Sequence, residues 1–469
     1  MSALVHASGM LATAREVVPA RAQMATTLGF HIILACFGIA FPTIVLFAEY
    51  IGLKRSDEVA MTLARRWSQA LGVLVAVGAV TGTVLSFEMG LLWPGLMRRY
   101  GAVIGLPFSV EGIFFFLEAI FTGIYLYGWR RLRGWAHFWS GIPVAVSGIF
   151  GAISVMAANS WMNQPGGFTL RAGRVVAVEP WAVFFNRASV YEMPHMVLAA
   201  YMVVGFAVAS VYAVGFLRGR RDRYHRLGFA IPFALAAALT PFQIFVGDTA
   251  ARAIATDQPV KFAAMEYVAH TSRGVPEYLG GVYSGGHVYF GLEIPDFDSL
   301  LVGFDPHTKV TGFDSVAPVD RPPAPTLIHL SFDAMVGLAF LLLLAGVWAL
   351  AAWRRRHALP EHRWFWWLAV ACGPAALVAM ECGWIVTEVG RQPWVVYRLL
   401  TTAQAATTNQ GVIASLTAVI ALYAVLGVAT VLTLRLLARR WRQGDQGEPA
   451  VPYGPPTGGP SRPIAGRAT

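Results

Sequence analysis

The chain has 469 residues, of which 56% are hydrophobic and 13% are charged, and its formal net charge is +10. This composition excludes an ordinary soluble enzyme and indicates a polytopic membrane protein. The basic excess gathers in particular loops, which is typical of membrane orientation and argues against nucleic acid as a partner. The three cysteines all lie within apolar runs, and therefore suggest packing residues and not a disulfide framework or a thiolate metal site: Cys36, Cys372 and Cys382.

Nine apolar segments are long enough to cross about 30 Å of hydrocarbon, and they predict an all-α protein with nine transmembrane helices. They lie near residues 27–49, 69–92, 108–128, 137–158, 194–217, 228–247, 327–351, 364–387 and 411–436. Most of the Lys and Arg residues fall in the C-terminal tail and in four connections, near 51–67, 129–136, 218–227 and 352–363. By the positive-inside rule these face the cytoplasm, which places the N-terminus outside and the C-terminus in the cytoplasm.

These expectations divide the chain into five parts. Residues 1–26 form an extracytoplasmic segment without the apolar core of a removable signal peptide. Residues 27–247 hold helices 1–6, residues 248–326 form an extracytoplasmic loop, and residues 327–440 hold helices 7–9. The tail at 441–469 is rich in Gly and Pro and is predicted to be disordered in the cytoplasm. The loop is too long for a simple connection and is therefore predicted to be functional.

The first span contains the string RAQMATTLGFH, in which Arg21 precedes His31 by ten residues. In a continuous helix this is a rise of about 15 Å. A lone histidine in a membrane helix is more often a hydrogen-bonded packing residue than a ligand, so this motif leaves both interpretations open.

The third span reads PFSVEGIFFFLEAIFTGIYLYGW and places Glu111 and Glu118 seven residues apart, on one helix face. Two carboxyl groups close together in a low dielectric do not readily both ionise, so at least one is expected to hold a proton. Proton handling is the natural use of such a pair. The alternative is two glutamates that face a polar cavity between helices.

The fourth span ends in AANSWMNQP, which contains Asn159 and Trp161, and the fifth begins with YEMPHMVLAAY, which contains His195. The seventh span contains Met335 in LSFDAMVGLAF, at the same predicted depth as His195. Histidine and methionine together can fill both axial positions of a haem iron. By itself, however, Met335 would be an ordinary core residue.

The predicted loop contains the string K-F-A-A-M-E, with Lys261 and Glu266 five residues apart. A solvated charge pair on a helix is the alternative to a binding site here. The eighth span ends in MECGWIVTEVGRQPW, which places Glu381 and Glu388 on one face near the membrane surface. Ionisable groups at membrane depth are costly, by about 2.5–3.5 kcal/mol for Asp, so they suggest function. The helix is expected to end near Gly390, leaving an interfacial arginine that can hold an anionic group.

The string GRQPW, with Glu388 two residues before it and Trp384 six before it, resembles subunit I of the cytochrome bd quinol oxidases. The other motifs follow in the family's order over about residues 20–436, and the loop length resembles the short-loop, or cyanide-insensitive, branch. The resemblance implies a multi-pass subunit of the bacterial cytoplasmic membrane. It would oxidise ubiquinol or menaquinol at the outer face and reduce O2 to water with protons from the cytoplasm. Its implied partners are membrane lipid, a second membrane subunit (subunit II) and, as a further candidate, a small single-helix subunit.

The same resemblance implies the cofactors. His195 and Met335 would bind the iron of a low-spin haem b. His31 and Glu388 would bind two high-spin haems, one a haem b and the other a haem d or a second haem b, and their assignment stays open. Glu111 would lie beside the haem at the oxygen site and is itself a candidate iron ligand. Glu118 would lie further along the proton route.

Around these haems the resemblance places Arg21, Asn159, Trp161, Trp384 and Arg391. In the loop, Lys261 and Glu266 would contact the quinol. Asp333 departs from the family, because some members carry an arginine two residues before the methionine ligand, so the haem potential cannot be carried over.

Two other classes of protein remain as alternatives. A proton-coupled transporter would use the membrane glutamates and bind no haem, and an electron-relay cytochrome b would carry only low-spin haem. A haem-copper oxidase is disfavoured, because no apolar span contains adjacent histidines.

Overall fold

The computed structural model describes residues 2–444, with side chains described from Val17 onward. Nine helices in this part are long and apolar enough to cross a membrane. They are α1 (Ser2–Arg55), α2 (Glu58–Leu92), α3 (Pro94–Gly128), α4 (Trp135–Asn163), α6 (Ser189–Leu217), α7 (Arg223–Asp257), α10 (Pro325–Arg356), α11 (Arg363–Gly390) and α13 (Val412–Arg442). The predicted all-α, nine-span fold is confirmed. The tail predicted to be disordered spans residues 441–469. Residues 441 and 442 instead end α13, and residues 445–469 lie outside the described residues.

The remaining elements are short. The helices are α5 (Pro180–Phe184), α8 (Pro259–Met265), α9 (Phe297–Gly303), α12 (Thr402–Ala405), η1 (Phe313–Ser315) and η2 (Pro318–Asp320). The strands of the described part pair in antiparallel twos: β1 (Phe168–Arg171) with β2 (Arg174–Val178), β3 (Ser272–Arg273) with β8 (Lys309–Val310), β4 (Glu277–Leu279) with β7 (Leu292–Ile294), β5 (Val282–Ser284) with β6 (His287–Tyr289), and β9 (Trp394–Val396) with β10 (Leu400–Thr401). The chain turns between β5 and β6 at Gly285 and Gly286, whose positive φ values of 59° and 87° favour glycine.

Several membrane helices run further than their apolar centres. The helix α7 continues to Asp257, beyond the predicted end at 247, and α3 begins at Pro94 instead of near 108. The helix α1 is already helical at Ser2, so the segment predicted at 1–26 continues into the first span. A hydropathy window finds only the apolar part of a helix, which explains the difference.

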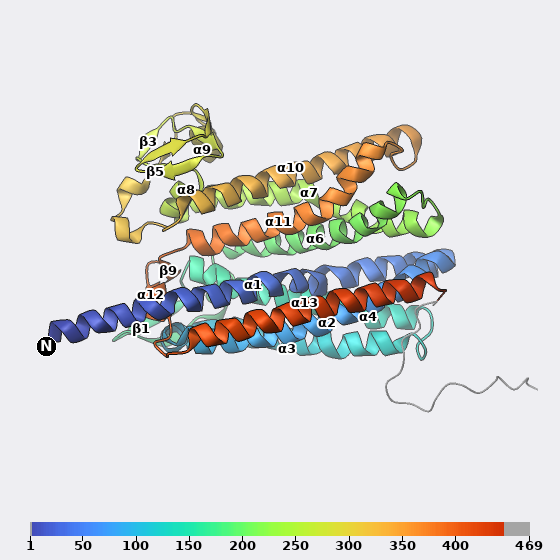
Figure 1. The fold of residues 1–469 in the computed structure, drawn as a ribbon, viewed down its shortest axis with the longest axis horizontal. Coiled ribbons are helices and arrows are strands. Elements are labelled where there is room, and N and C mark those ends of the chain that lie inside the picture. Colours follow the sequence, from blue (N-terminus) through green and yellow to red (C-terminus); the bar gives the residue numbers. More distant parts are fainter. Residues whose placement is uncertain (1, 445–469) are drawn as a thin grey trace, which may run out of the picture.

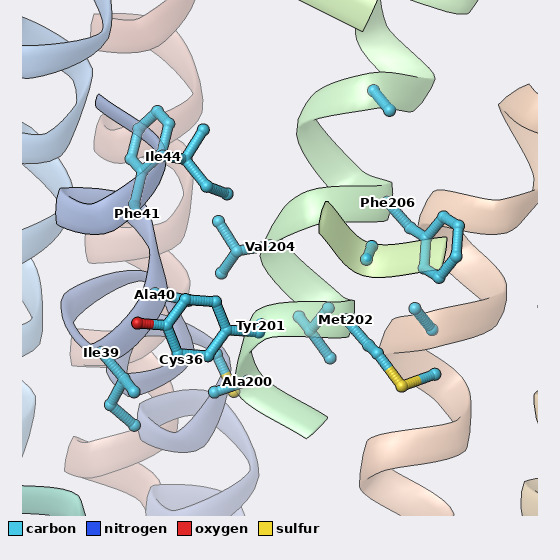
Figure 2. Packing of buried hydrophobic residues seen from close by; sticks show 14 of the residues in the cluster. Cys36, Ile39, Ala40, Phe41, Ile44, Ala200, Tyr201, Met202, Val204 and Phe206 are labelled. Carbon is cyan, nitrogen blue, oxygen red and sulfur yellow. The ribbon is translucent and has the colours of Figure 1, made fainter. Parts of the chain in front are cut away.

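The bundle has two groups of helices joined through α1, α4 and α6 (Figure 1). One group contains α6, α7, α10 and α11, and in the other α1 contacts α2, α4 and α13. Figure 2 shows the contact between α1 and α6, where Ile44 and Val204 lie in the buried core. Within it, Thr43 Oγ1 and Tyr201 OH are 2.7 Å apart. Cys36 lies in the same core, 3.6 Å from the Met380 sulfur, which agrees with its prediction as a packing residue.

The two ends of the bundle differ in character. The loop between α7 and α10, the β1–β2 hairpin and the β9–β10 pair all lie at one end, which we call the loop end (Figure 1). At the opposite end a buried network joins three helices. His137 Nδ1 on α4 and Tyr125 OH on α3 both lie 2.7 Å from the Glu49 carboxylate on α1. The predicted site residues near the helix ends at 163, 189, 325 and 390 therefore share the loop end.

Candidate functional site

His31 on α1 faces α2, and a hydroxyl orients its ring. Nδ1 lies 2.9 Å from Thr81 Oγ1. The single hydroxyl proton of Thr81 is directed to the backbone carbonyls of Val77 and Gly78, so Thr81 accepts from Nδ1–H of His31. Nε2 then carries a lone pair and no proton. A ring held in this tautomer is suited to bind a metal through Nε2.

His195 on α6 and Met335 on α10 lie within about three turns of the loop end of their helices. They belong to the same four-helix group. Nε2 of His195 is 3.3 Å from the Gln243 side-chain nitrogen, and its Nδ1 is buried without a hydrogen-bond partner. A buried polar atom without a partner costs about 1–3 kcal/mol, so the ring is not simply a satisfied core histidine.

Three of the four predicted haem ligands face a glycine on a neighbouring helix, and Glu388 is the exception. The pairs are His31 with Gly82, His195 with Gly247, and Met335 with Gly383. A Cβ atom at these glycines would lie 3.0, 3.3 and 3.0 Å, respectively, from the nearest atom of the facing side chain. Any larger residue would crowd the ligand atom or its ring. The glycines were not identified from the sequence, because a glycine in a membrane helix has many ordinary uses.

Glu388 ends α11 within a polar cluster. It accepts a hydrogen bond from Asn159 Nδ2 at 2.9 Å and pairs with Arg391 Nη2 at 2.5 Å. Both of its oxygens are thereby engaged, so binding a metal would require one of these contacts to be exchanged. Arg391 is buried, and its Nε and Nη1 have no partner. Since buried donors without acceptors are costly, Arg391 is suited to hold a further anionic group.

Three further residues complete this cluster and were missed from the sequence. Asn163 Nδ2 donates to Asn159 Oδ1 at 3.1 Å and to Glu192 Oε1 at 2.7 Å. Gln258 donates to the Asn163 backbone carbonyl at 3.0 Å. The available signals were weak: Asn163 follows Asn159 by one helical turn, and Glu192 precedes His195 by three residues.

Lys261 on α8 belongs to the same polar region. Its side chain is buried and passes Gly390, with Cγ 3.1 Å from the position of a Cβ there. With Arg391 and Trp394 it lines a cavity of about 270 Å³. Burial lowers the pKa of Lys261 to about 8, although the nearby Glu192 opposes this shift. The predicted Asn159, Lys261, Glu388 and Arg391 are thus brought to one region.

Glu266, just after α8, joins a different cluster. It is buried with Glu277 and Asp298, and one oxygen from each carboxylate lies within 4.8 Å of the others. Burial, and then repulsion from Glu277, Asp298 and Asp333, raises the pKa of Glu266 well above its ordinary value. The structure therefore separates the K-F-A-A-M-E pair: Lys261 faces the cavity, and Glu266 faces other carboxylates.

Glu111 and Glu118 lie on one continuous helix, α3, about 10 Å apart along its axis. Both are half-buried. Glu118 Oε1 lies 3.0 Å from where a Cβ at Gly38 of α1 would be. The Gly38 carbonyl oxygen in turn lies 2.7 Å from the Cβ position of Gly148 on α4. These glycines let three helices approach closely and allow the Glu118 carboxyl group to lie against α1.

The other predicted residues are more scattered. Arg21 shares α1 with His31, about 15 Å along the axis, and lines a second cavity of about 400 Å³ together with Arg321. Trp384 packs beside the main apolar core. Trp161 is fully buried and donates to the Gly166 carbonyl at 2.8 Å. These contacts are those of packing and interfacial residues.

Two acidic residues have identifiable neighbours. Asp333 accepts a hydrogen bond from the Gly280 amide at 2.6 Å and lies 3.3 Å from His329 Nε2, so it joins α10 to the loop. Glu381 faces α1 at Gly29, and its Oε1 is buried without a partner. The departure at Asp333 thus has a structural role in this chain.

Residues 19–442 match the family model described as cytochrome bd terminal oxidase subunit I. A Bacillus subtilis protein with the provisional name cytochrome bd menaquinol oxidase subunit I is 34% identical, covering 91% of this chain and 97% of the relative. The chain belongs to the cytochrome bd terminal oxidase subunit I family. The cytochrome bd-II ubiquinol oxidase subunit 1 of Escherichia coli is 25% identical, with 91% and 97% covered. The solved bd oxidase of Geobacillus thermodenitrificans has a TM-score of 0.83 at 36% identity, covering 91% of this chain and 98% of that one.

Family membership and the nine apolar helices identify a multi-pass protein of the bacterial cytoplasmic membrane. Membership also implies haem as cofactor, and the residues fit that group. His31 has a free Nε2, His195 a buried Nδ1 without a partner, and Met335 a thioether, each beside a glycine. Arg391 supplies two unpartnered donors, as a haem propionate requires.

Proposed function

We propose that this chain is the haem-carrying subunit of a quinol:dioxygen oxidoreductase. His195 and Met335 bind a low-spin haem b. His31 and Glu388 bind two high-spin haems, one a haem b and the other haem d or a second haem b, with Glu111 beside the oxygen site. The observation that carries this proposal is the set of three potential axial ligands that each face a glycine inside the bundle.

When bound, the haems supply one-electron transfer and the site of oxygen reduction. The side chains of this chain orient them. Thr81 fixes the tautomer of His31, and the free donors of Arg391 compensate propionate charge. His195 and Met335 would hold the iron of one haem from both sides, and a haem held in this way would supply electron transfer only.

Quinol oxidation is proposed to use the two ends of α8 differently. Lys261 lines the cavity and holds a quinol oxygen there. Glu266, five residues after Lys261, accepts a proton from the quinol hydroxyl or passes it on. Such a transfer needs an acceptor within about 3 Å of the hydroxyl. Because Glu266 faces Glu277, the proton has a second carboxylate to move to.

The proton side of the reaction is assigned to α3. Glu118 and then Glu111 receive protons that originate in the cytoplasm and pass them toward the oxygen site through ordered water. The basic connections support the orientation, with the loop end outside.

Exposed apolar residues such as Phe116, Ile120 and Ile124 give α3 an outer face suited to lipid or to a second membrane subunit. Subunit II and a small single-helix subunit are the proposed partners.

Oxygen consumption by the purified complex tests this function. We expect turnover with a reduced quinol, and parallel assays with ubiquinol and menaquinol analogues would identify the substrate. Preparations of a Lys261→Ala variant with normal haem content provide the matched control. Haem-loaded wild-type complex that consumes no oxygen with either quinol would contradict the proposal.

A further inference from the structure

The loop between α7 and α10 encloses three carboxylates that arrive from separate segments. Glu266 follows α8, Glu277 begins β4, and Asp298 lies in the first turn of α9. Their exposed fractions are 3%, 7% and 0%. One oxygen from each lies within 4.8 Å of the others. No sequence pattern indicates this cluster, because its members are separated by up to 32 positions.

The charge of this cluster is not balanced by the protein. No ion pair joins any of the three to a Lys or Arg among residues 17–444, and the groups that act on them electrostatically are themselves carboxylates. His329 on α10 has its ring nitrogens beside the Met265 and Gly280 carbonyls, and its ion pair is with Asp333. Burying several carboxyl groups together without a counter-charge is strongly unfavourable.

Asp298 provides a second and more specific observation. Both of its oxygens are buried without a hydrogen-bond partner, and it is aimed at the other two carboxylates. Glu266 and Glu277 each have one further buried oxygen without a partner. The neighbouring Ser299 is fully satisfied, since its hydroxyl accepts from the Val275 amide and donates to the Thr308 carbonyl. On α9, therefore, the Ser299 hydroxyl is paired, whereas both oxygens of the adjacent Asp298 are not.

The oxygen spacing matches the coordination shell of a hard cation. Ligand oxygens lie at 2.3–2.6 Å from Ca²⁺, so two oxygens on one ion are at most about 5 Å apart. Carboxylates are ligands that Ca²⁺, Mg²⁺ and Mn²⁺ prefer, and Ca²⁺ tolerates the irregular geometry of a loop best. We propose that Glu266, Glu277 and Asp298 form a divalent cation site that prefers Ca²⁺.

A cation at this position would connect the parts of a loop that has little regular structure. It would hold the end of α8 to β4 and α9, which otherwise meet through short strand pairs and a few side-chain contacts. The site shares Glu266 with the proposed quinol chemistry, and Glu277 is the onward acceptor of the quinol proton. The two proposals can still fail separately, because Asp298 has no part in quinol oxidation and Lys261 has no part in the cation site.

Protons are the competing way to neutralise the cluster. Burial raises the pKa of Glu277 to about 7 and of Asp298 to about 8, with other carboxylates adding to both shifts. Protons and Ca²⁺ should thus compete, and Ca²⁺ binding should strengthen as the pH rises from about 6 to 9.

The test is equilibrium binding of radioactive ⁴⁵Ca²⁺ to the purified complex at pH 8, after chelation and desalting. We expect one Ca²⁺ per chain, displaced weakly by Mg²⁺, and a loss of affinity of about tenfold or more in Asp298→Asn and Glu277→Gln. Asp305→Asn is the matched control, since Asp305 is an exposed acid of the same loop. It should bind as wild type does.

A second readout guards against misfolded variants. In the wild-type complex, chelation should speed trypsin cleavage in the loop, where Arg273 and Lys309 are exposed, and added Ca²⁺ should restore resistance. Three results would overturn the proposal: no stoichiometric binding at millimolar Ca²⁺, equal binding by wild type and Asp298→Asn, or cleavage that is insensitive to chelation. Any of them would leave protons as the only compensation of the cluster.

Discussion

The membrane bundle and the loop at its end both carry predicted site residues, but they differ in how position along the chain relates to position in space. In the bundle, Glu111 and Glu118 lie on one face, as their seven-residue spacing requires. In the loop, Lys261 and Glu266 are closer in sequence yet belong to different clusters. In a long continuous helix such as α3, the spacing of two residues in the sequence predicts that their side chains share a face. In α8, which has only about two turns, residues near the two ends contact different neighbours.

The largest effect is expected in the bundle, from Met335→Leu. Leucine has a similar volume but no sulfur, so the iron opposite would keep only His195 and would lose its low-spin state. We expect the low-spin haem signal to disappear completely while the other haem signals remain. Reduced-minus-oxidised spectra of the purified variant measure this, with Met202→Leu, a buried methionine of α6, as control. A normal low-spin spectrum in a folded Met335→Leu complex would remove Met335 from the proposed site.

The next effect concerns proton delivery along α3. Glutamine at position 118 keeps the shape of the side chain and removes its exchangeable carboxyl proton. We expect haems to assemble but oxygen reduction to slow by about 10²-fold or more, the usual scale of a lost proton-transfer group. Flow-flash oxidation of the fully reduced enzyme with a pH indicator follows both proton uptake and haem oxidation. Glu111→Gln should in addition disturb a high-spin haem. Wild-type rates in Glu118→Gln would leave this glutamate with a structural role only.

In the loop, the separation of Lys261 from Glu266 predicts two different kinetic defects. Lys261→Ala should mainly raise KM for quinol, because it lines the cavity. Glu266→Ala should mainly lower kcat, by about 10²-fold, because a proton acceptor is lost. Haem content should be unchanged in both. If the two variants changed the same kinetic parameter to the same degree, Lys261 and Glu266 would act together on the quinol. The proposed separation of binding from proton acceptance would then be wrong.

The smallest expected effect is on how the stability of the loop depends on pH after divalent cations have been chelated. The pKa values of Glu277 and Asp298 are raised to about 7 and about 8 by burial, so the folded loop binds these protons more tightly than the unfolded chain. The stability they contribute is fully present below about pH 4 and is lost as the pH rises through 7 and 8. Hydrogen exchange of loop amides should quicken by about tenfold between pH 6 and 9 beyond its intrinsic dependence. In Asp298→Asn, the exchange rate of the loop amides should depend less on pH than in the wild type. An equally weak pH dependence in the wild type would contradict the prediction.

The sequence allowed the bundle to be predicted closely and the loop only in part. Apolar length identified the nine spans, and helical periodicity placed Glu111 with Glu118. It also placed His195 and Met335 at one depth. What escaped prediction depends on contacts between distant segments. Gly82, Gly247 and Gly383 acquire meaning only when a facing helix brings a ligand against them.

The same limit applies to the polar clusters at the loop end. Asn163 and Gln258 are ordinary amides in the sequence. In the structure, Asn163 joins Asn159 to Glu192, and Gln258 donates to the backbone carbonyl of Asn163. Asp298 belongs with Glu266 only because the loop brings the start of α9 back to the residue that follows α8, and no local pattern encodes that return. Helix ends were also misplaced, since α7 continues to Asp257 through a more polar stretch beyond the apolar span predicted to end at 247.

The proposed oxidase is tested most directly by the absorption spectrum of the reduced wild-type complex before and after carbon monoxide is added. We expect one haem whose spectrum does not respond, because His195 and Met335 would hold its iron from both sides, and high-spin haem whose spectrum shifts. Pyridine haemochrome analysis of the same sample would count haem b and haem d. A complex whose haem is entirely insensitive to carbon monoxide would be an electron relay, and one without haem would be a transporter. Either result would contradict the proposed oxidase.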